Sequence, residues 1–252
     1  MFLFAKESLA ATYYVSTAGS DAAGTGSLSN PWRTIQKAAG IVSPGDTVSI
    51  RGGTYREAVS LTRGGTASAY ILFQNYPGET VNIDGADEAI ANGQVTWTDF
   101  GGGIYYTNLT WSAISGDSMG YAAVDGQKMY FYKTKFNTFA NFQTDSWLVN
   151  RSSWYWDSNT NRLYVKLVNV SNPDPAAHNM TVARLSAGFY FNGYGSNNPD
   201  YTVLKGINVI NHQQKGIESY KAGNLVIDAC TVSGYGNAGI YAGQGNNITI
   251  RN

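Results

Sequence analysis

A repeat of about 23 residues in the last third of the chain is the feature that most constrains its fold. Cut at this spacing, the segments YTVLKGINVINHQQKGIESYKAG, NLVIDACTVSGYGNAGIYAGQG and NNITIRN align, with Leu204, Ile227 and Ile250 at one position and Gly216 and Gly239 at another. Apolar residues alternate with a period of two in each segment, which is typical of strands with one buried face. A β-sandwich does not require one fixed period, whereas stacked coils do. The repeat therefore predicts a solenoid of short parallel strands.

The same spacing returns near the N-terminus, in DTVSIRGGTY and YILFQNYPGETVNIDG. We align Val48 with Ile71 and Ile50 with Phe73, so the coils are expected to begin before residue 50. Each inward apolar side chain contributes on the order of 1.5–3 kcal/mol by leaving water, provided that it lands in the same row of every coil. The two ends of the chain are therefore predicted to share one core.

One short helix is predicted ahead of the first coil, within SNPWRTIQKAAG. Asn30 is the predicted N-cap, Pro31 stands at the first helical position, and Gly40 follows the last turn. The predicted apolar face comprises Trp32, Ile35, Ala38 and Ala39. Because the open end of a coil stack exposes unpaired N–H and C=O groups that can recruit another chain, this helix is expected to cap the first coil.

The stretch YYVSTAGSDAAGTGSLSNPWRTIQKAAGIVSPGDTVSIRGGTYRE, followed by YILFQNYPGETVNIDG and by the two coils that carry Gly-Ile, resembles the right-handed parallel β-helix proteins of the pectate-lyase-like superfamily. The resemblance covers the cap, the first coils and the last third of the chain. It implies an all-β fold, a right-handed parallel β-helix with a short N-terminal capping helix. It also implies kinship with proteins that are mostly secreted polysaccharide lyases and glycoside hydrolases.

Residues 89–180 interrupt the period for much longer than an ordinary connecting loop. The pattern WYWDSNTNRLYVKL predicts a β-hairpin, because two alternating strands flank a polar turn. We therefore expect an inserted antiparallel β-excursion that folds against the flank of the coils. Five of the six tryptophans fall in this stretch, and most are expected in its core, with one or two exposed. These five are Trp97, Trp111, Trp147, Trp154 and Trp156.

Four segments follow from these observations: 1–12 as a cropped signal peptide or disordered leader, 13–88 as the cap and first coils, 89–180 as the aromatic-rich excursion, and 181–252 as further coils. The leader interpretation rests on the apolar start and on Leu9-Ala10-Ala11, which resembles a signal-peptidase site. Because the last repeat stops within a strand, we expect the sequence to be the N-terminal portion of a longer protein that is secreted or lies at the cell surface.

The charge balance argues against several classes of partner. Only 13% of the residues are charged, with 17 basic against 17 acidic, so no basic surface for nucleic acid is expected. No run is long and apolar enough to span a bilayer. The single cysteine, Cys230, cannot form an internal disulfide; it aligns with the inward Ile207 and is predicted to be a small buried apolar residue. The full-length protein is expected to be monomeric.

Three candidate catalytic residues follow the inward positions of the last coils: Lys205, Asp228 and Arg251. Neighbouring strands lie about 4.8 Å apart, so these outward side chains should stack with alternating charge. One interpretation is a charge ladder, in which each exposed pair contributes roughly 1 kcal/mol or less. The family resemblance implies another, because lyases of this fold use a Lys or Arg as base and acidic side chains or calcium to neutralise a uronic-acid carboxylate. The metal requirement is left open.

Three residues near the bends are candidate substrate contacts: His212, Tyr235 and Glu218. His212 is also compatible with an exposed turn histidine, and Glu218 with a solvated turn charge. Asp84 is interpreted first as a turn residue before Gly85.

These observations lead to one functional hypothesis and two alternatives. The leading hypothesis is a polysaccharide lyase that acts by β-elimination on uronic-acid-containing chains outside the cell. A glycoside hydrolase on the same scaffold is one alternative, and it would require two carboxylates about 5–9 Å apart across a groove. A non-catalytic glycan-binding or surface-adhesion solenoid is the other.

Overall fold

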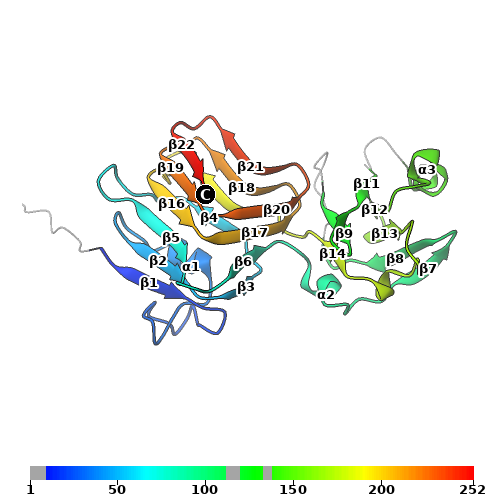
Figure 1. Ribbon diagram of the computed structural model, residues 1–252, viewed down its shortest axis with the longest axis horizontal. Helices are drawn as coiled ribbons and strands as arrows, with labels where there is room; N and C mark the ends of the chain where they lie inside the picture. Colours follow the sequence, from blue (N-terminus) through cyan, green and yellow to red (C-terminus); the bar gives the residue numbers. More distant parts are fainter. Residues whose placement is uncertain (1–9, 112–119, 133–137) are drawn as a thin grey trace, which may run out of the picture.

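The structure is a computed structural model and describes residues 10–111, 120–132 and 138–252. Its strands form two bodies, a stack of parallel coils built from both ends of the chain and a flanking body built from the middle (Figure 1). We call residues 88–182, which form the flanking body, the excursion. Within the described ranges, no helix is both long and apolar enough to cross a membrane.

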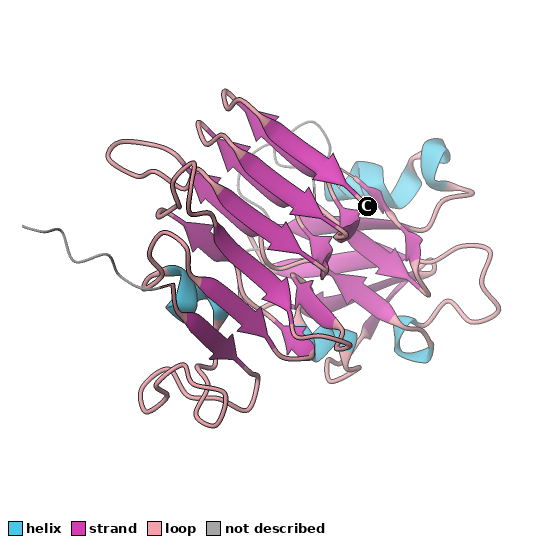
Figure 2. Ribbon diagram, turned by 60° about the vertical axis from the view of Figure 1, so that its left-hand side comes forward, coloured by secondary structure: helices cyan, strands magenta, loops and turns pink. Residues whose placement is uncertain are grey.

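Three parallel sheets make up the coils, and their strands stack in the same order along the molecule (Figure 2). The first sheet contains β1 (Thr12–Val15), β2 (Thr47–Ile50), β5 (Ile71–Asn75), β16 (Thr202–Lys205), β19 (Leu225–Asp228) and β22 (Ile248–Arg251). The second contains β3 (Gly53–Tyr55), β6 (Val81–Asp84), β17 (Ile207–His212) and β20 (Thr231–Tyr235). The third contains β4 (Val59–Leu61), β15 (Ala187–Asn192), β18 (Lys215–Tyr220) and β21 (Ala238–Gly243). Each coil contributes one strand to each sheet, which confirms the predicted parallel β-helix.

The predicted rows of apolar side chains are present, with one correction near the N-terminus. Leu204 pairs in register with Ile227, and Ile227 with Ile250, as the repeat predicts. Val48 pairs with Phe73 rather than with Ile71, so the upstream alignment is wrong by two residues. The chain makes an extra tight turn between β4 and β5, where the backbones of Thr66 and Ala69 form an antiparallel bridge around a two-residue loop. This turn lengthens the coil. A shift of two leaves the same face inward, so the core prediction survives.

The capping helix α1 (Ile35–Ala39) begins later than predicted. Thr34 is its N-cap, with Oγ1 accepting from the backbone N–H of Lys37 at 3.1 Å, so the predicted N-cap Asn30 is wrong. The reason is that Trp32 pairs its backbone with β1: its N–H donates to the carbonyl oxygen of Tyr14 at 3.0 Å. The predicted apolar face is confirmed, since these residues are all buried in the coil core: Trp32, Ile35, Ala38 and Ala39. The helix covers the first coil.

The excursion replaces a two-residue turn. In the third coil, Gln213 and Gln214 alone join β17 to β18. One coil earlier the corresponding connection, from β6 to β15, contains the whole excursion. β15 nevertheless pairs with β4 on one side and β18 on the other, so the coil stack continues past the insertion without a gap.

Two sheets form the excursion. One has the order β11-β12-β13-β8-β7 and is antiparallel except for the β11–β12 pair; the other has the order β10-β9-β14 and is antiparallel. The predicted hairpin is β12 and β13. The elements are α2 (Glu88–Ala91), β7 (Thr98–Gly101), β8 (Ile104–Asn108), β9 (Ala122–Val124), β10 (Gln127–Lys128), β11 (Tyr130–Phe131), α3 (Phe139–Thr144), η1 (Ser146–Leu148), β12 (Ser153–Asp157), β13 (Arg162–Lys166), η2 (Pro175–Ala177) and β14 (Met180–Val182).

The tryptophans of the excursion divide as predicted. Trp154 and Trp156 are buried in its core, and Trp97 and Trp111 are partly buried against the same cluster. Trp147 is the exception, with 70% of its surface exposed.

Candidate functional site

Three successive strands of the third sheet each carry a tyrosine at an outward position. Tyr190 on β15 pairs with Glu218 on β18, and Glu218 pairs with Tyr241 on β21. Two residues further along, Asn192 pairs with Tyr220. These positions alternate with buried ones, because successive side chains of a strand point to opposite faces. The coils therefore place one tyrosine from each of three successive strands on the same outer face, in two neighbouring columns.

A stacked pair extends this face beyond the end of β15. The rings of Tyr194 and Tyr220 are 4.6 Å apart between centroids with an interplanar angle of 14°, and Lys221 Nζ lies 4.8 Å from the Tyr194 centroid. The hydrogen bond to Tyr220 raises the pKa of Tyr194 to about 12, so this phenol is protonated at neutral pH. Tyr194 is 45% exposed and presents its ring to solvent.

Lys215 lies at the start of β18 and links two groups of the same face. Its ammonium pairs with the carboxylate of Glu218 and lies 4.3 Å from the ring centroid of Tyr241. Gly243 permits the packing of the tyrosines, because a β-carbon there would lie 2.7 Å from Cε1 of Tyr241 and 3.2 Å from Cδ2 of Tyr220.

We call this surface the tyrosine face. It comprises Tyr190, Tyr194, Lys215, Glu218, Tyr220, Lys221 and Tyr241. Aromatic faces with two ammonium groups and one carboxylate suit a ligand that has an apolar face and negative charge.

The three predicted catalytic residues form a row on a different face, the outer side of the first sheet. Lys205 pairs in register with Asp228, and Asp228 with Arg251. Nε of Arg251 is 3.3 Å from Oδ1 of Asp228, and the Arg251 side chain is 61% exposed. The stacking and the alternating charges are as predicted; the catalytic role stays a prediction.

His212 is not the exposed turn histidine that the sequence suggested. It is 0% exposed at the end of β17, and neither ring nitrogen has a hydrogen-bond partner. The ring fits between two glycines: a β-carbon at Gly85 would lie 2.7 Å from its Cδ2, and one at Gly188 would lie 3.0 Å from its Cε1. Burial lowers the pKa of His212 to about 4, so the ring is neutral at physiological pH. The side chain is out of reach of a substrate in this structure.

Tyr235 pairs in register with His212 and lies where the coils meet the excursion. Its carbonyl oxygen accepts a hydrogen bond from Nζ of Lys128 in the excursion at 2.8 Å. The second sheet therefore holds Tyr235 and His212, and of the predicted substrate contacts Glu218 alone belongs to the tyrosine face.

The family description "Pel9A-like, right handed beta helix region" matches residues 13–189, which is more than half of the chain. The chain belongs to the Pel9A-like right-handed β-helix family. Pectate lyase PEL9 of Emericella nidulans is 43% identical over 81 residues, which are 31% of this chain and 20% of that protein. Two solved structures share the fold: XylC in complex with xylose (20% identical, TM-score 0.59, covering 86% of this chain and 40% of that one) and a glycoside hydrolase (12% identical, TM-score 0.60, covering 92% and 63%). The chain spans less than two thirds of each of these proteins.

In this Pel9A-like β-helix, a second candidate is a cleft of about 400 Å³ beside the cap. It is lined by Thr17, Arg33, Thr34, Thr54, Tyr55, Arg56, Glu57 and Glu88. Two carboxylates on one cleft invite comparison with a hydrolase. However, both carboxylate oxygens of Glu57 accept from the first N–H groups of α1, those of Ile35 and Gln36, at 2.9 Å each. Burial raises the pKa of Glu57. This carboxylate is committed to the cap, so the cleft supplies no free acid pair.

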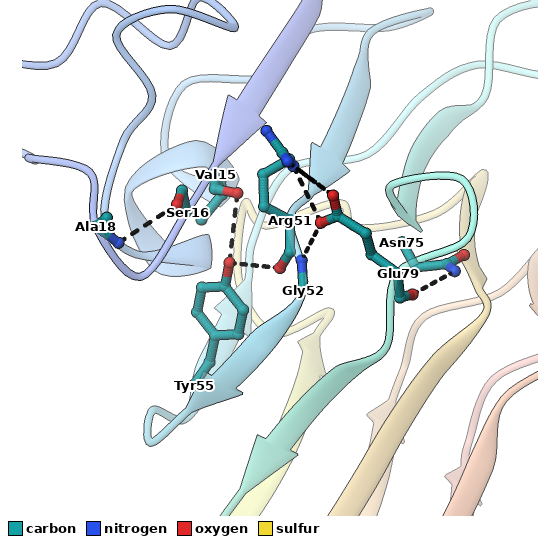
Figure 3. A network of polar contacts seen from close by, with 8 residues as sticks. All are labelled: Val15, Ser16, Ala18, Arg51, Gly52, Tyr55, Asn75 and Glu79. Atoms are coloured by element: carbon teal, nitrogen blue, oxygen red, sulfur yellow. Dashed lines mark hydrogen bonds and ion pairs between the residues drawn. The ribbon is translucent and has the colours of Figure 1, made fainter.

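Two other charged clusters near the cap are structural ion pairs. Arg51 binds Glu79 through Nε and Nη2 at 3.0 and 2.7 Å, and Tyr55 Oη donates to the carbonyl oxygen of Arg51 at 2.8 Å (Figure 3). Asp84 is buried and lies 2.7 Å from Nη1 of Arg56, and its Oδ1 accepts from the backbone N–H of Ala86 at 3.0 Å, so it supports the turn at Gly85 as predicted and also forms an ion pair. These contacts join neighbouring coils.

The family resemblance implies calcium as a possible cofactor. Among the described residues, no group of three or more His, Cys, Asp or Glu side chains comes together to hold a metal ion.

Sequence reasoning missed most of the tyrosine face, although the signal was present. The segments AGFYFN, KGIESY and AGIYAG each place polar or aromatic residues at the positions between inward ones. Reading those outward positions across three aligned coils would have grouped Tyr190, Tyr220 and Tyr241 with Glu218.

Proposed function

We propose that the protein is a secreted polysaccharide lyase-like enzyme, or the N-terminal part of one, that binds a uronic-acid-containing chain along its tyrosine face. The observation that carries this proposal is the presence of outward tyrosines on three successive strands of one sheet, with Lys215 and Lys221 set against two of the neighbouring rings. Membership of the Pel9A-like family, together with the 43% identity to a pectate lyase, supports the choice of an acidic polysaccharide.

The face suits such a chain in two ways. Open tyrosine rings offer flat apolar surfaces on which the C–H face of a sugar can pack. The ammonium group of Lys221 attracts carboxylates, whereas that of Lys215 is paired with Glu218 and holds the ring of Tyr241 in place. A repeated strand places equivalent groups about 4.8 Å apart, so an extended polymer can contact several coils at once.

β-Elimination would remove the proton next to the uronate carboxylate and break the adjacent C–O bond of the glycosidic link. A Lys amine or an Arg guanidine near that carbon, in its deprotonated form, is the expected base, and the leaving glycosidic oxygen departs with a proton. The row of Lys205, Asp228 and Arg251 remains the candidate for this step. It lies on the first sheet, whereas the tyrosine face lies on the third, so the two assignments can be tested separately.

The decisive experiment is incubation with polygalacturonate, alginate and chondroitin sulfate while ultraviolet absorbance is followed. An unsaturated product confirms elimination, and repetition with a calcium chelator reports the metal requirement. New reducing ends without ultraviolet absorbance would replace the lyase by a hydrolase. Binding without cleavage would leave a glycan-binding solenoid.

The tyrosine face is tested by Tyr220→Ala and Lys215→Ala in the same protein. Each should weaken polysaccharide binding by about tenfold, which corresponds to ~1.4 kcal/mol. Tyr106→Ala, a tyrosine on the excursion sheet under Arg162, is the matched control and should bind normally. Unchanged binding in both face variants would refute the assignment.

A further inference from the structure

The excursion carries an exposed aromatic group that the tyrosine face does not include. Trp147 lies in η1, which follows one residue after α3, and Figure 1 shows α3 at the end of the excursion remote from the coils. It is 70% exposed, and Val149 beside it is 61% exposed. A tryptophan left in water forgoes the large contribution that burial of its ring would make. Adjacent exposed apolar groups are typical of a binding site.

The turn that carries Trp147 is held firmly. Oδ1 of Asp145 accepts from the backbone N–H of Trp147 at 2.9 Å, and Oδ2 accepts from Tyr132 Oη at 2.7 Å. These hydrogen bonds lower the pKa of Asp145. The next residue, Leu148, is fully buried in the excursion core with Phe142. The indole is therefore presented to solvent by an anchored turn, so little conformational entropy would be lost on binding.

A guanidinium group lies between Trp147 and a second exposed ring. Cζ of Arg151 is 5.5 Å from the Trp147 ring centroid and 5.7 Å from that of Tyr130, which is 44% exposed. Across the described ranges of the chain, Arg151 pairs with no carboxylate. We call Tyr130, Trp147 and Arg151 the tryptophan patch. It combines two aromatic faces with a guanidinium that no carboxylate of the described residues neutralises.

The charge decides between two possible occupants. A second copy of the chain, related by a two-fold axis, would bring the same patch against itself and place one Arg151 near the other. That arrangement costs energy through like-charge repulsion. A carboxylate-bearing sugar is complementary instead, because a guanidinium can hold a carboxylate with two parallel hydrogen bonds while the ring faces pack on the sugar.

We propose that the tryptophan patch is a second binding site for carboxylate-bearing polysaccharide, separate from the tyrosine face. Trp147 packs on the C–H face of one sugar unit, and Arg151 binds its carboxylate. The choice of an acidic polysaccharide rests on the proposed function. Two sites on one protein raise the effective concentration of a long chain at the second site once the first is occupied.

The test uses the whole chain and polygalacturonate, with dextran as the uncharged comparison. Acrylamide quenching of tryptophan fluorescence reports Trp147 most strongly, since it is 70% exposed whereas Trp97 and Trp111 are partly buried and Trp32, Trp154 and Trp156 are buried; Trp147→Ala isolates its share of the signal. We expect polygalacturonate, and not dextran, to protect this fluorescence from quenching. In affinity electrophoresis, Trp147→Ala and Arg151→Ala should each weaken binding by about tenfold.

Arg162→Ala is the matched control, because Arg162 also lies over a tyrosine, Tyr106, at 4.5 Å but has no neighbouring exposed tryptophan. It should bind normally. Unchanged binding in Trp147→Ala and Arg151→Ala overturns the proposal, and so does self-association that Trp147→Ala abolishes. If binding disappears in Lys215→Ala and Tyr220→Ala but not in the patch variants, the patch fails and the tyrosine face stands. If cleavage tests are negative while Trp147 is still protected, the lyase proposal fails and the patch stands.

Discussion

The coils and the excursion bury apolar side chains in opposite ways. In the coils each buried residue meets its equivalent in the next coil, as Leu204 meets Ile227. In the excursion the core is a cluster of unlike rings, in which Phe139 lies 4.1 Å from Tyr164 and Phe142 lies 5.6 Å from Tyr155 between centroids. A repeating core is therefore specified by the spacing of apolar residues in the sequence, whereas a single aromatic core is specified by which rings come into contact in the folded chain.

The largest effect is expected when one core ring is removed from each body. Phe189 in the coils and Phe142 in the excursion are both fully buried, so Phe189→Ala and Phe142→Ala should each cost about 3–5 kcal/mol. The reach of the damage should differ. Phe189 pairs with Val59 and Ile217 in neighbouring coils, so its loss should lower hydrogen-exchange protection in β4 and β18.

Phe142→Ala is the counterpart, and its loss of protection should stay within the excursion, in β12 and β13. The contrast between coils and excursion would be refuted if Phe142→Ala lowered hydrogen-exchange protection in β16 and β19 as strongly as in β12. The two bodies would then unfold as one cooperative unit.

Spacing predicted the coils well because the physics of stacking is periodic. Leu204, Ile227 and Ile250 were placed correctly without any structure. The upstream register failed by two residues, since an extra turn at Thr66–Ala69 lengthens one coil without changing which face is buried. The start of α1 failed because backbone pairing of Trp32 with β1 overrides a good local capping sequence.

The site was harder to predict because exposure depends on neighbours that are distant in sequence. The sequence does not indicate which of the five tryptophans is exposed to solvent. Trp147 is exposed because the neighbouring Leu148 occupies the buried position of this turn. Nor could it show that Gly85 and Gly188, more than 100 residues apart, enclose His212. Glu218 was found as a polar residue near a bend, and only the register joined it to Tyr190 and Tyr241.

The second prediction concerns His212, the buried histidine of the coils. Its folded-state pKa of about 4 lies below the ordinary value of 6.5. Between these two pH values the unfolded chain is protonated at His212 and the folded chain is not. The contribution of His212 should be constant above pH 6.5, and it should lower stability by up to about 3 kcal/mol in total as the pH drops from 6.5 to 4. Urea unfolding at pH 7 and pH 4.5 measures this loss.

His212→Leu should flatten that pH dependence, since leucine does not titrate. Because leucine differs in shape, the comparison uses the difference between the two pH values within each protein, which cancels the packing change. An unchanged acid dependence in this variant would show that the coils lose stability through other groups.

The third prediction is a smaller effect of opposite sign, from His178 in the excursion. The carbonyl oxygen of Asn172 accepts from its Nε2 at 2.6 Å, and Asp125 lies 2.7 Å from its Nδ1, and these contacts raise the pKa of His178. This contribution is fully present below the unfolded pKa of about 6.5 and is lost as the pH rises through the folded value. As the pair is partly exposed, roughly 1 kcal/mol or less is expected.

Asp125→Asn tests this contact and should remove part of the pH dependence above pH 6.5 in the excursion, because the hydrogen bond to the carbonyl oxygen of Asn172 remains. Hydrogen exchange in β9 and β14 at pH 6 and pH 8.5 is the measurement, because Asp125 follows β9 and His178 precedes β14. If His212→Leu and Asp125→Asn change the pH dependence of stability in the same direction over the same pH range, the contrast between the bodies is wrong.

The smallest effect on stability is expected where the coils stack charges instead of apolar groups. Lys205→Ala and Arg251→Ala remove exposed side chains of the first sheet, so unfolding free energies should change by no more than about 0.5 kcal/mol. A change in lyase activity in either variant would then report on the chemical step, because the fold should be unperturbed. Loss of the unsaturated product in Lys205→Ala, with polysaccharide binding intact, would place the base of the elimination in this row. Full activity in both variants would leave the row as a charge ladder, which is the form that a repeating scaffold gives to ordinary surface ion pairs.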